Sequence, residues 1–389
     1  MPQLEKIKFR NFLFLIFFSI LNYPVLFSSS GNDSTDAEVA YRIILIGDTG
    51  EPAINYREPV LIALRNAASL FDSTVVIYLG DNIYMNGLPD TNDNTRKEFE
   101  TKLDKQINSI ENTGAIAYFI SGNHDWASDD DVGWIQVKRQ ADYISGKNNP
   151  KIKFAPSNAC PGPELVTFGS KINLIFLDTQ WFLQKKGRPD PEDCNCSYYN
   201  EDDIFRSTDS LLNESVNKLT IIAAHHPLST HGPHGGHFTW KQHIFPLTEV
   251  SSVLWIPLPI IGSSYPLARI WGISSQDISS SVYENYISEM ENILSKYSGI
   301  IYASGHEHAI QIIDGIGDNT YVVSGAGIYD YHTSSIGIGD DTIVAGEYEG
   351  FVILDLLMDD RIRLTVSRVI NKSGDTETTF TMWLDYLFK

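Results

Sequence analysis

The stretch Tyr302-Ala303-Ser304-Gly305-His306-Glu307-His308 places two histidines, one residue apart, in a turn that directly follows an apolar run. The run begins at Ile300 and predicts a short buried strand. Imidazole is the commonest protein ligand for transition metals. A pair of histidines in one turn is also compatible with an ordinary surface loop, so its meaning depends on the rest of the chain.

Four earlier turns have the same construction, in which a strand-like apolar run ends in a polar turn with ligand-type side chains. The runs cover residues 41–46, 75–79, 116–120 and 219–224, and the turns supply Asp48, then Asp81 and Tyr84, then Asn123, then His225. Alternation of strand, polar turn and helix is typical of α/β folds, where ligand-binding groups gather beyond the carboxyl ends of strands. One such turn carries no weight, but five in this order rarely arise by chance. Together with His306 and His308, they predict a site for two metal ions.

The remaining periodicity predicts further helices and strands around this site. The helices are expected near residues 59–70, 96–110 and 282–294, and the strands near residues 172–177, 320–323, 350–356 and 361–366, of which the last three are expected to be antiparallel closing strands.

One long apolar stretch stands out between these elements. Residues 253–273 contain Pro257, Pro259 and Pro266, which exclude a transmembrane helix. We interpret the surrounding residues 246–280 as an insertion that covers part of the molecule. A loop that touches a membrane is the alternative interpretation.

The composition is that of a globular protein. The chain has 389 residues, of which 42% are hydrophobic and 20% charged, enough for one large domain or two ordinary ones. The formal net charge of −20 argues against sequence-independent binding of nucleic acid or of anionic lipid. An anionic substrate is still compatible with this charge, because bound cations can dominate the local field of a site.

Residues 1–30 have the pattern of a secretory signal peptide, in which basic residues precede an apolar run over residues 12–21 and small residues follow it. An uncleaved anchor that tethers the chain to a membrane is the alternative. Asn22 and Pro24 interrupt this stretch, which would need about 20 apolar residues to span a bilayer. Either interpretation predicts export, to the periplasm, the extracellular space or the outer face of a membrane.

The chain has three cysteines, Cys160, Cys194 and Cys196. Export permits a disulfide. The separation of Cys194 and Cys196 by one residue is too tight for an easy bridge between them, so Cys160 is expected to pair with one or the other.

The five ligand turns resemble the five sequence blocks of the calcineurin-like metallophosphoesterases. The blocks are Gly47-Asp48, Gly80-Asp81, Gly122-Asn123-His124, His225 and Gly305-His306-Glu307-His308, within about residues 41–330. Many members have Asp-x-His in the first block, whereas Gly50 occupies the histidine position here. The second block, which ends in Tyr84, is similar to the Gly-Asp-x-x-Tyr of the purple acid phosphatases. The resemblance therefore favours this branch over the phosphodiesterase and nuclease branches.

This resemblance implies a fold. It is an α/β four-layer sandwich in which two central mixed β-sheets are flanked by helices. The metallophosphoesterase domain would span residues 31–389, with a core over about residues 41–330 and closing strands over residues 331–389.

The resemblance also implies the metal ligands. They are Asp48, Tyr84 and His308 for one ion, Asn123, His225 and His306 for the other, and Asp81 as the bridge between the two. A phenolate is a hard oxygen donor that stabilises a trivalent ion, so the first ion is expected to be iron(III). The second is expected to be a divalent iron, zinc or manganese.

The implied activity is acid phosphatase-like hydrolysis of phosphomonoesters. Two metal ions roughly 3.5–4 Å apart clamp a phosphate and supply hydroxide at modest pH, and a protonated imidazole can donate to the leaving oxygen. His124 is the implied second-shell imidazole. His231 and His234 compete for the remaining role, because His231 begins a His-Gly-Pro motif like that of the small purple acid phosphatases, while His234 better keeps the family's distance from His225.

Two other functions are compatible with these motifs. One is a di-manganese or di-zinc phosphodiesterase or nucleotidase of the same superfamily, in which Tyr84 is an ordinary aromatic residue. The other is a surface binding protein that has lost catalysis, which would show a broken ligand set, whereas no ligand is missing here. The expected partner is a small phosphate ester, and no nucleic acid is expected.

Overall fold

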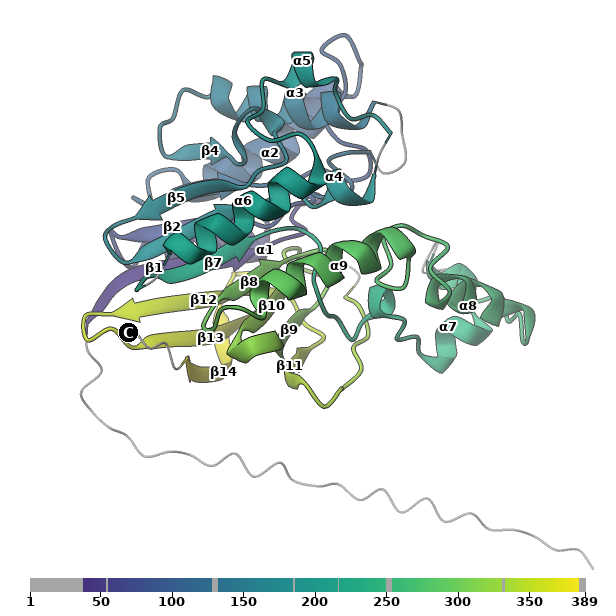
Figure 1. Cartoon of the computed structure of the whole chain (residues 1–389). Helices are drawn as coiled ribbons and strands as arrows, with labels where there is room; N and C mark the ends of the chain where they lie inside the picture. Colours follow the sequence, from purple (N-terminus) through teal and green to yellow (C-terminus); the bar gives the residue numbers. More distant parts are fainter. Residues whose placement is uncertain are drawn as a thin grey trace, which may run out of the picture. The chain divides into compact units, whose positions relative to one another are not determined.

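Two seven-stranded mixed β-sheets form the framework of the described chain (Figure 1). The computed structural model describes residues 38–384 apart from residues 54, 128–131, 185, 216, 250–253 and 331–332. The first sheet has the order β14 (Thr376–Leu384), β13 (Ile362–Val369), β12 (Gly350–Leu357), β1 (Val39–Ile46), β2 (Thr74–Tyr78), β3 (Ile116–Phe119) and β4 (Ile152–Phe154). The second has the order β11 (Thr342–Gly346), β9 (Ile310–Asp314), β10 (Thr320–Ser324), β8 (Ile301–Ser304), β7 (Leu219–Ala223), β6 (Ile172–Phe176) and β5 (Glu164–Phe168).

The first sheet is parallel on one side and antiparallel on the other, whereas the second has a parallel centre and antiparallel edges. Strands β1 to β4 are parallel neighbours, and β12 joins β1 in antiparallel register. In the second sheet β6, β7, β8 and β10 are parallel. Parallel neighbours end at the same edge of a sheet, so the turns after β1, β2 and β3 share one edge and the turns after β7 and β8 share another.

Alternate residues of the strands face two different cores. Ile43 and Leu45 of β1 belong to the core between the sheets, together with Leu174 of β6. Ile44 and Ile46 of β1 belong instead to the core beneath the helices. Because both faces of the strand are covered, it is apolar without alternation, as the sequence of a buried parallel strand should be.

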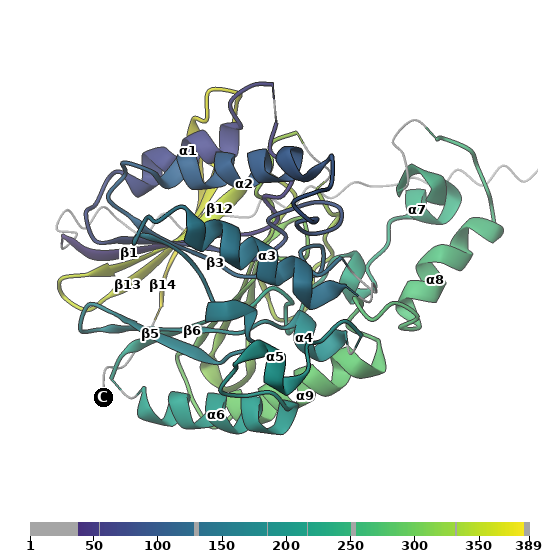
Figure 2. The same cartoon turned by 90° about the horizontal axis from the view of Figure 1, so that it is seen from above.

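Helices cover the outer faces of both sheets. The helices are α1 (Pro59–Ala68), α2 (Arg96–Ile110), α3 (Gly133–Gly146), α4 (Gln180–Leu183), α5 (Pro191–Cys194), α6 (Glu201–Glu214), α7 (Trp240–Ile244), α8 (Ser264–Ile270) and α9 (Ser281–Leu294). Helices α1 and α2 lie on one side of the two sheets, and α6 and α9 lie on the opposite side (Figure 2). Helix, sheet, sheet and helix are the four layers that the family resemblance implies.

Most of the predicted elements are confirmed. The predicted helix over residues 96–110 has the bounds of α2, and the predicted closing strands over residues 350–356 and 361–366 are β12 and β13, paired antiparallel. The strand predicted over residues 320–323 is β10, which is antiparallel to β9 but parallel to β8, so its pairing was only half predicted. The periodicity missed α3, α6, the edge strands β4, β5, β11 and β14, and the inner strand β9.

The disulfide joins Cys160 to Cys196, and Cys194 is a buried free thiol. The predicted signal peptide or anchor over residues 1–30 lies outside the described residues. Within the described part of the chain, no helix combines the length and the hydrophobicity that crossing a bilayer requires.

Residues 240–273, which we call the lobe, contain α7 and α8. In both views these two helices lie together, beyond the ends of the strands (Figures 1 and 2). The lobe includes most of the predicted insertion over residues 246–280. It returns to the main body through residues 274–280, where the Ile278 amide donates to the His234 carbonyl at 3.0 Å.

Candidate active site

The seven side chains predicted as metal ligands follow five strands from the two sheets. Asp48 follows β1, Asp81 and Tyr84 follow β2, Asn123 follows β3, His225 follows β7, and His306 and His308 follow β8. The structure brings all seven together, in two groups of three with Asp81 between them.

Asp48, Tyr84 and His308 form the first group. The Tyr84 hydroxyl donates to Asp48 Oδ1 at 3.0 Å and lies 3.0 Å from His308 Nε2. His308 Nε2 also lies 3.5 Å from Asp48 Oδ1. Burial lowers the pKa of His308, but the neighbouring Asp48 carboxylate outweighs this effect and raises it. The group is therefore a compact set of one carboxylate, one phenol and one imidazole.

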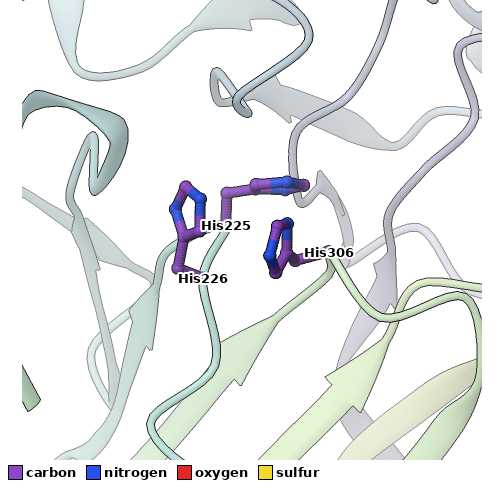
Figure 3. Close-up of side chains that lie close together, drawn as sticks. All are labelled: His225, His226 and His306. Carbon is purple, nitrogen blue, oxygen red and sulfur yellow. The ribbon is translucent and has the colours of Figure 1, made fainter. Parts of the chain in front are cut away.

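Asn123, His225 and His306 form the second group. Oδ1 of Asn123 lies 2.9 Å from His225 Nε2 and 3.0 Å from His306 Nδ1. The rings of His225 and His306 come from different strands and converge, and the ring of His226 lies beside them (Figure 3).

The hydrogen bonds of the two rings show what this second group can hold. The other nitrogen of each ring faces a backbone carbonyl, Leu79 O at 2.7 Å for His225 and Gln276 O at 2.9 Å for His306. A neutral imidazole has one N–H, and each carbonyl can accept it. Two imidazole lone pairs and the amide oxygen of Asn123 then converge on one another, and a cation satisfies all three. The donor set therefore fits a metal ion.

Asp81 connects the two groups. Ligand atoms of Asp48, Asp81 and His225 all lie within 4.8 Å of one another, so one carboxylate is within reach of both groups. Its Oδ1 lies 3.5 Å from His225 Nε2 and accepts the His124 backbone N–H at 2.9 Å. Burial raises the pKa of Asp81, but attraction to His225 and His124 outweighs it and holds this pKa far below its ordinary value.

The turns that carry these ligands have unusual backbone geometry. Asp48, Asp81 and His306 have φ of 56°, 51° and 68°, in the left-handed region that non-glycine residues rarely adopt. Gly122 is required for a different reason, since a Cβ there would lie 2.3 Å from Asp81 Oδ1. The glycine that precedes Asn123 therefore leaves room for Asp81.

Asp125 holds two of these turns together, and the sequence did not single it out. The buried carboxylate accepts the backbone N–H groups of Asn82, Ile83 and Gly122 at 2.8–3.2 Å. Burial and the nearby Asp81 carboxylate raise its pKa. An aspartate two residues after a proposed ligand carries no sequence signal of this role, because two of its three partners belong to the turn after β2.

A cavity of about 500 Å³ lies against the two groups. This volume is within the range of small-molecule sites. Half of its lining comes from the two ligand groups and nearby histidines, namely Asp81, Asn123, His124, His234, His306 and His308. The other half comes from the predicted insertion, namely Tyr265, Ala268, Arg269, Ile273, Ser274 and Gln276.

The three histidines predicted to act on the substrate have different positions. His124 and His234 line the cavity. Nδ1 of His124 faces the Met85 carbonyl at 2.8 Å. His231 is not among the cavity-lining residues, and its Nε2 lies 2.7 Å from Asp341 Oδ1 instead. The His-Gly-Pro motif alone therefore does not bring His231 into the cavity.

Three residues of the insertion position His234. Nδ1 of His234 lies 3.0 Å from the Gln276 carbonyl and 3.1 Å from Asp277 Oδ1. Arg269 pairs with the same Asp277 carboxylate, and one of its terminal nitrogens lies 2.9 Å from His234 Nδ1. Burial raises the pKa of Asp277, but hydrogen bonds from Arg269 and His234 outweigh this and lower it.

Gln276 is the second residue that sequence analysis missed. Its carbonyl accepts from His306 and His234, and its side-chain oxygen lies 2.9 Å from His226 Nε2. His226 Nδ1 in turn lies 2.8 Å from the Thr179 hydroxyl, so both of its nitrogens have protein partners. Burial and the neighbouring His225 hold the pKa of His226 well below its usual value.

Comparisons with known proteins agree with this geometry. The family model of calcineurin-like phosphoesterases matches residues 41–309. Purple acid phosphatase 3 from Arabidopsis thaliana is 23% identical over 276 residues, which are 66% of this chain and 69% of the relative.

Two solved structures share the fold. GAP50, described as the anchor in the inner membrane complex of Plasmodium, superposes with a TM-score of 0.53 and 15% identity, covering 89% of this chain and 88% of its own. Purple acid phosphatase PPD1 from yellow lupin (Lupinus luteus) seeds superposes with a TM-score of 0.53 and 14% identity, covering 90% of this chain and 54% of its own. At these identities the two structures support the fold alone.

The family match covers more than half of the chain and all five ligand turns. The strand order, the two seven-stranded sheets and the buried groups of aspartate and histidine at the strand ends are consistent with that match. The chain therefore belongs to the calcineurin-like phosphoesterase family, a family of hydrolases that act on phosphoric esters.

Proposed function

We propose that this chain hydrolyses phosphomonoesters with two metal ions, as an acid phosphatase-like enzyme. The observation that carries the proposal is the position of Asp81 between two groups of three ligands, with its ligand atom within 4.8 Å of those of Asp48 and His225. A carboxylate so placed can bind both ions at once. One ion would be held by Asp48, Tyr84 and His308, and the other by Asn123, His225 and His306.

The donor types support an assignment of the metals. The first group offers a phenol and a carboxylate, hard oxygen donors that favour a trivalent ion, and we propose iron(III) there. The second group offers two imidazoles and an amide oxygen, which suit a divalent iron, zinc or manganese. When bound, such a pair polarises the phosphate ester and makes a nucleophile available from water at modest pH.

The chain's own residues bind and orient the ester. We assign His124 and His234 to the substrate, because both line the cavity beside the ligands. Each has Nδ1 directed at a backbone carbonyl, of Met85 and of Gln276 respectively, so the nitrogen left for the substrate is Nε2. A protonated imidazole donating from Nε2 to the leaving oxygen contributes about 10²–10⁴-fold to the rate.

The insertion would restrict what enters. Tyr265 and Ile273 form an apolar part of the wall opposite the metal ligands, and Arg269 is the cation of that wall. A cavity of about 500 Å³ accommodates a phosphate group and a leaving group of moderate size. We therefore propose small phosphomonoesters, including aryl phosphates, as the substrate class.

We also propose that the protein is exported. The disulfide between Cys160 and Cys196 supports this proposal, because disulfides persist in oxidising compartments. The signal-like composition of residues 1–30 is the second support.

A substrate panel tests the proposed function. Metal-analysed protein should be assayed on aryl and alkyl phosphomonoesters, on bis-aryl phosphodiesters and on nucleotides, between about pH 4 and pH 8. The proposal expects turnover of monoesters with an acid to neutral optimum and little turnover of diesters. Preference for diesters or nucleotides would favour the phosphodiesterase or nucleotidase alternative, and no turnover of any ester would refute the proposal.

A further inference from the structure

The lobe exposes an unusual number of large apolar side chains. Of the 22 large hydrophobic residues exposed among the described residues, ten lie in this segment of 34 residues. Ile260 is 91% exposed and Trp271 is 71% exposed. Three of the seven tryptophans of the chain, Trp240, Trp255 and Trp271, are in the lobe and are all exposed. Such concentration of apolar surface marks an interaction site rather than scattered surface residues.

Helix α8 shows that most of this exposure is separate from the cavity, although Tyr265 and Ile273 are exposed and also line it. Residues 265, 268 and 269 line the cavity, and their spacing places them on one face of the helix. Leu267, Ile270 and Trp271 are exposed, and their spacing places them on the opposite face. One face of α8 therefore belongs to the site, while the other is partly exposed, with Trp271 the most exposed residue on it.

The charges of the lobe and of the whole chain indicate which kind of partner the lobe can bind. Residues 240–273 contain one acidic residue, Glu249, and two basic residues, Lys241 and Arg269, whereas the whole chain has a net charge of −20. Arg269 is paired with Asp277, so the lobe has no basic cluster for an anionic surface. A second copy of this chain would bring two strongly negative molecules together, and their repulsion opposes self-association.

We propose that the lobe docks on the surface of an electrically neutral lipid bilayer, with its tryptophans at the level of the lipid head groups. Tryptophan prefers this interface because its ring is apolar and its N–H needs a polar partner. The isoleucines beside it bury in the acyl boundary, as the apolar face of an interfacial helix does. This inference does not depend on the proposed function, because it rests only on exposure, residue type and charge.

Quenching of tryptophan fluorescence tests the proposal with the full chain. Vesicles of phosphatidylcholine with brominated acyl chains quench only tryptophans that reach the bilayer. Residues 1–36 contain no tryptophan, so an apolar N-terminal segment that binds the vesicles would not itself be quenched. The proposal expects quenching that decreases when phosphatidylserine replaces part of the phosphatidylcholine, because the negative chain is then repelled.

Two matched variants make the test specific. The lobe variant Trp255→Ser/Ile260→Ser/Trp271→Ser should bind vesicles at least about tenfold more weakly in a flotation assay, since each side chain contributes to burial in the lipid. The control variant Leu70→Ser/Met358→Ser/Ile370→Ser changes three exposed apolar residues outside the lobe and should bind like the wild type. Circular dichroism melting checks that both variants are folded.

Each outcome decides the proposal. Quenching of the wild type, with binding lost in the lobe variant and kept in the control, supports it. No quenching, or equal binding by the lobe variant, overturns it. Sedimentation without lipid gives the competing result, because a dimer that the lobe substitutions dissociate would show that the lobe binds a second copy instead.

Discussion

The hydroxyl of Tyr84 lies 3.0 Å from Nε2 of His308, although 224 positions separate the two residues in the sequence. Tyr84 leaves the first sheet after β2, and His308 leaves the second sheet after β8. Their meeting shows that the edges at which the strands of the two sheets end face each other. The Asp48 carboxylate completes this group, because the Tyr84 hydroxyl donates to it at 3.0 Å.

Tyr84→Phe tests the assignment of iron(III). A tyrosinate bound to iron(III) absorbs visible light by charge transfer, so we expect the protein as isolated to be violet to pink. The substitution removes only the oxygen of a buried ring, so the colour should disappear while the melting temperature changes by a few degrees at most. A visible spectrum and a thermal melt of both proteins measure these effects. A colourless wild type, fully active with two zinc or two manganese ions, would contradict the iron(III) assignment.

Asp81→Ala and His124→Ala should separate metal binding from catalysis. Asp81 lies within reach of both ligand groups, so its loss should reduce the metal content from two ions per chain toward none. His124 lines the cavity without belonging to either group, so His124→Ala should keep both ions and lower kcat by about 10²–10⁴-fold. Elemental analysis and steady-state kinetics give the two readouts. If Asp81→Ala retained two ions, Asp81 would not be the bridge.

Gly122→Ala should damage the site without a change in any ligand. The new Cβ would lie 2.3 Å from Asp81 Oδ1 and 2.4 Å from the Asp81 amide nitrogen, closer than real Cβ atoms come. We expect Asp81 to shift and metal content to fall. Gly146→Ala is the matched control, because a Cβ at the end of α3 meets nothing within 4 Å; it should bind metal normally and change stability by at most about 1 kcal/mol. Equal metal content in the two variants would rule out the steric role of Gly122.

Asp277→Asn should change the dependence of stability on pH. Its folded-state pKa is lowered below the ordinary value of 3.8, so the stability contributed by its charge is fully present above about pH 4 and is lost as pH falls through the folded-state pKa. At neutral pH we expect Asp277→Asn to lower the free energy of unfolding by about 1.5–3 kcal/mol, because Arg269 loses a charged partner. The difference from the wild type should shrink below pH 4.

Urea unfolding at several pH values measures this effect. The control is Asp142→Asn, which breaks an exposed pair with Lys138 on one helix and should leave the urea midpoint nearly unchanged at every pH. A difference between wild type and Asp277→Asn that stayed constant from pH 7 to pH 3 would show that Asp277 is not stabilised as a carboxylate.

The grouping of the seven proposed ligands could be predicted from the sequence because each of them lies in a turn that follows a strand. Asp48, Asn123 and His306 are recognisable from an apolar run, a glycine and a ligand-type residue in succession, a local pattern. The rule that parallel strands end at one edge then brings them together. Strand β12 was predicted because it is a nearly continuous apolar run, and β13 because apolar residues recur along it.

The residues of the site that the sequence could not predict owe their roles to contacts with residues far away in the chain. Gln276 and Asp277 look like ordinary polar residues of a loop, and their roles arise only because the insertion folds back against His234 and His306. Asp125 is hidden in the same way, since two of its three amide partners belong to the turn after β2. The edge strand β14 was missed because residues 376–379 are threonines and a glutamate that face solvent.

Hydrolysis of phosphomonoesters with two metal ions is tested most simply by counting metal ions and measuring turnover on the same sample. Purified wild-type protein should contain two ions per chain and hydrolyse an aryl phosphomonoester. A chelator that removes the ions should abolish turnover, and adding back iron with zinc or manganese should restore it. Two results would contradict two-metal hydrolysis of phosphomonoesters. One is turnover that persists in metal-free protein, and the other is a protein with two ions that hydrolyses no phosphate ester.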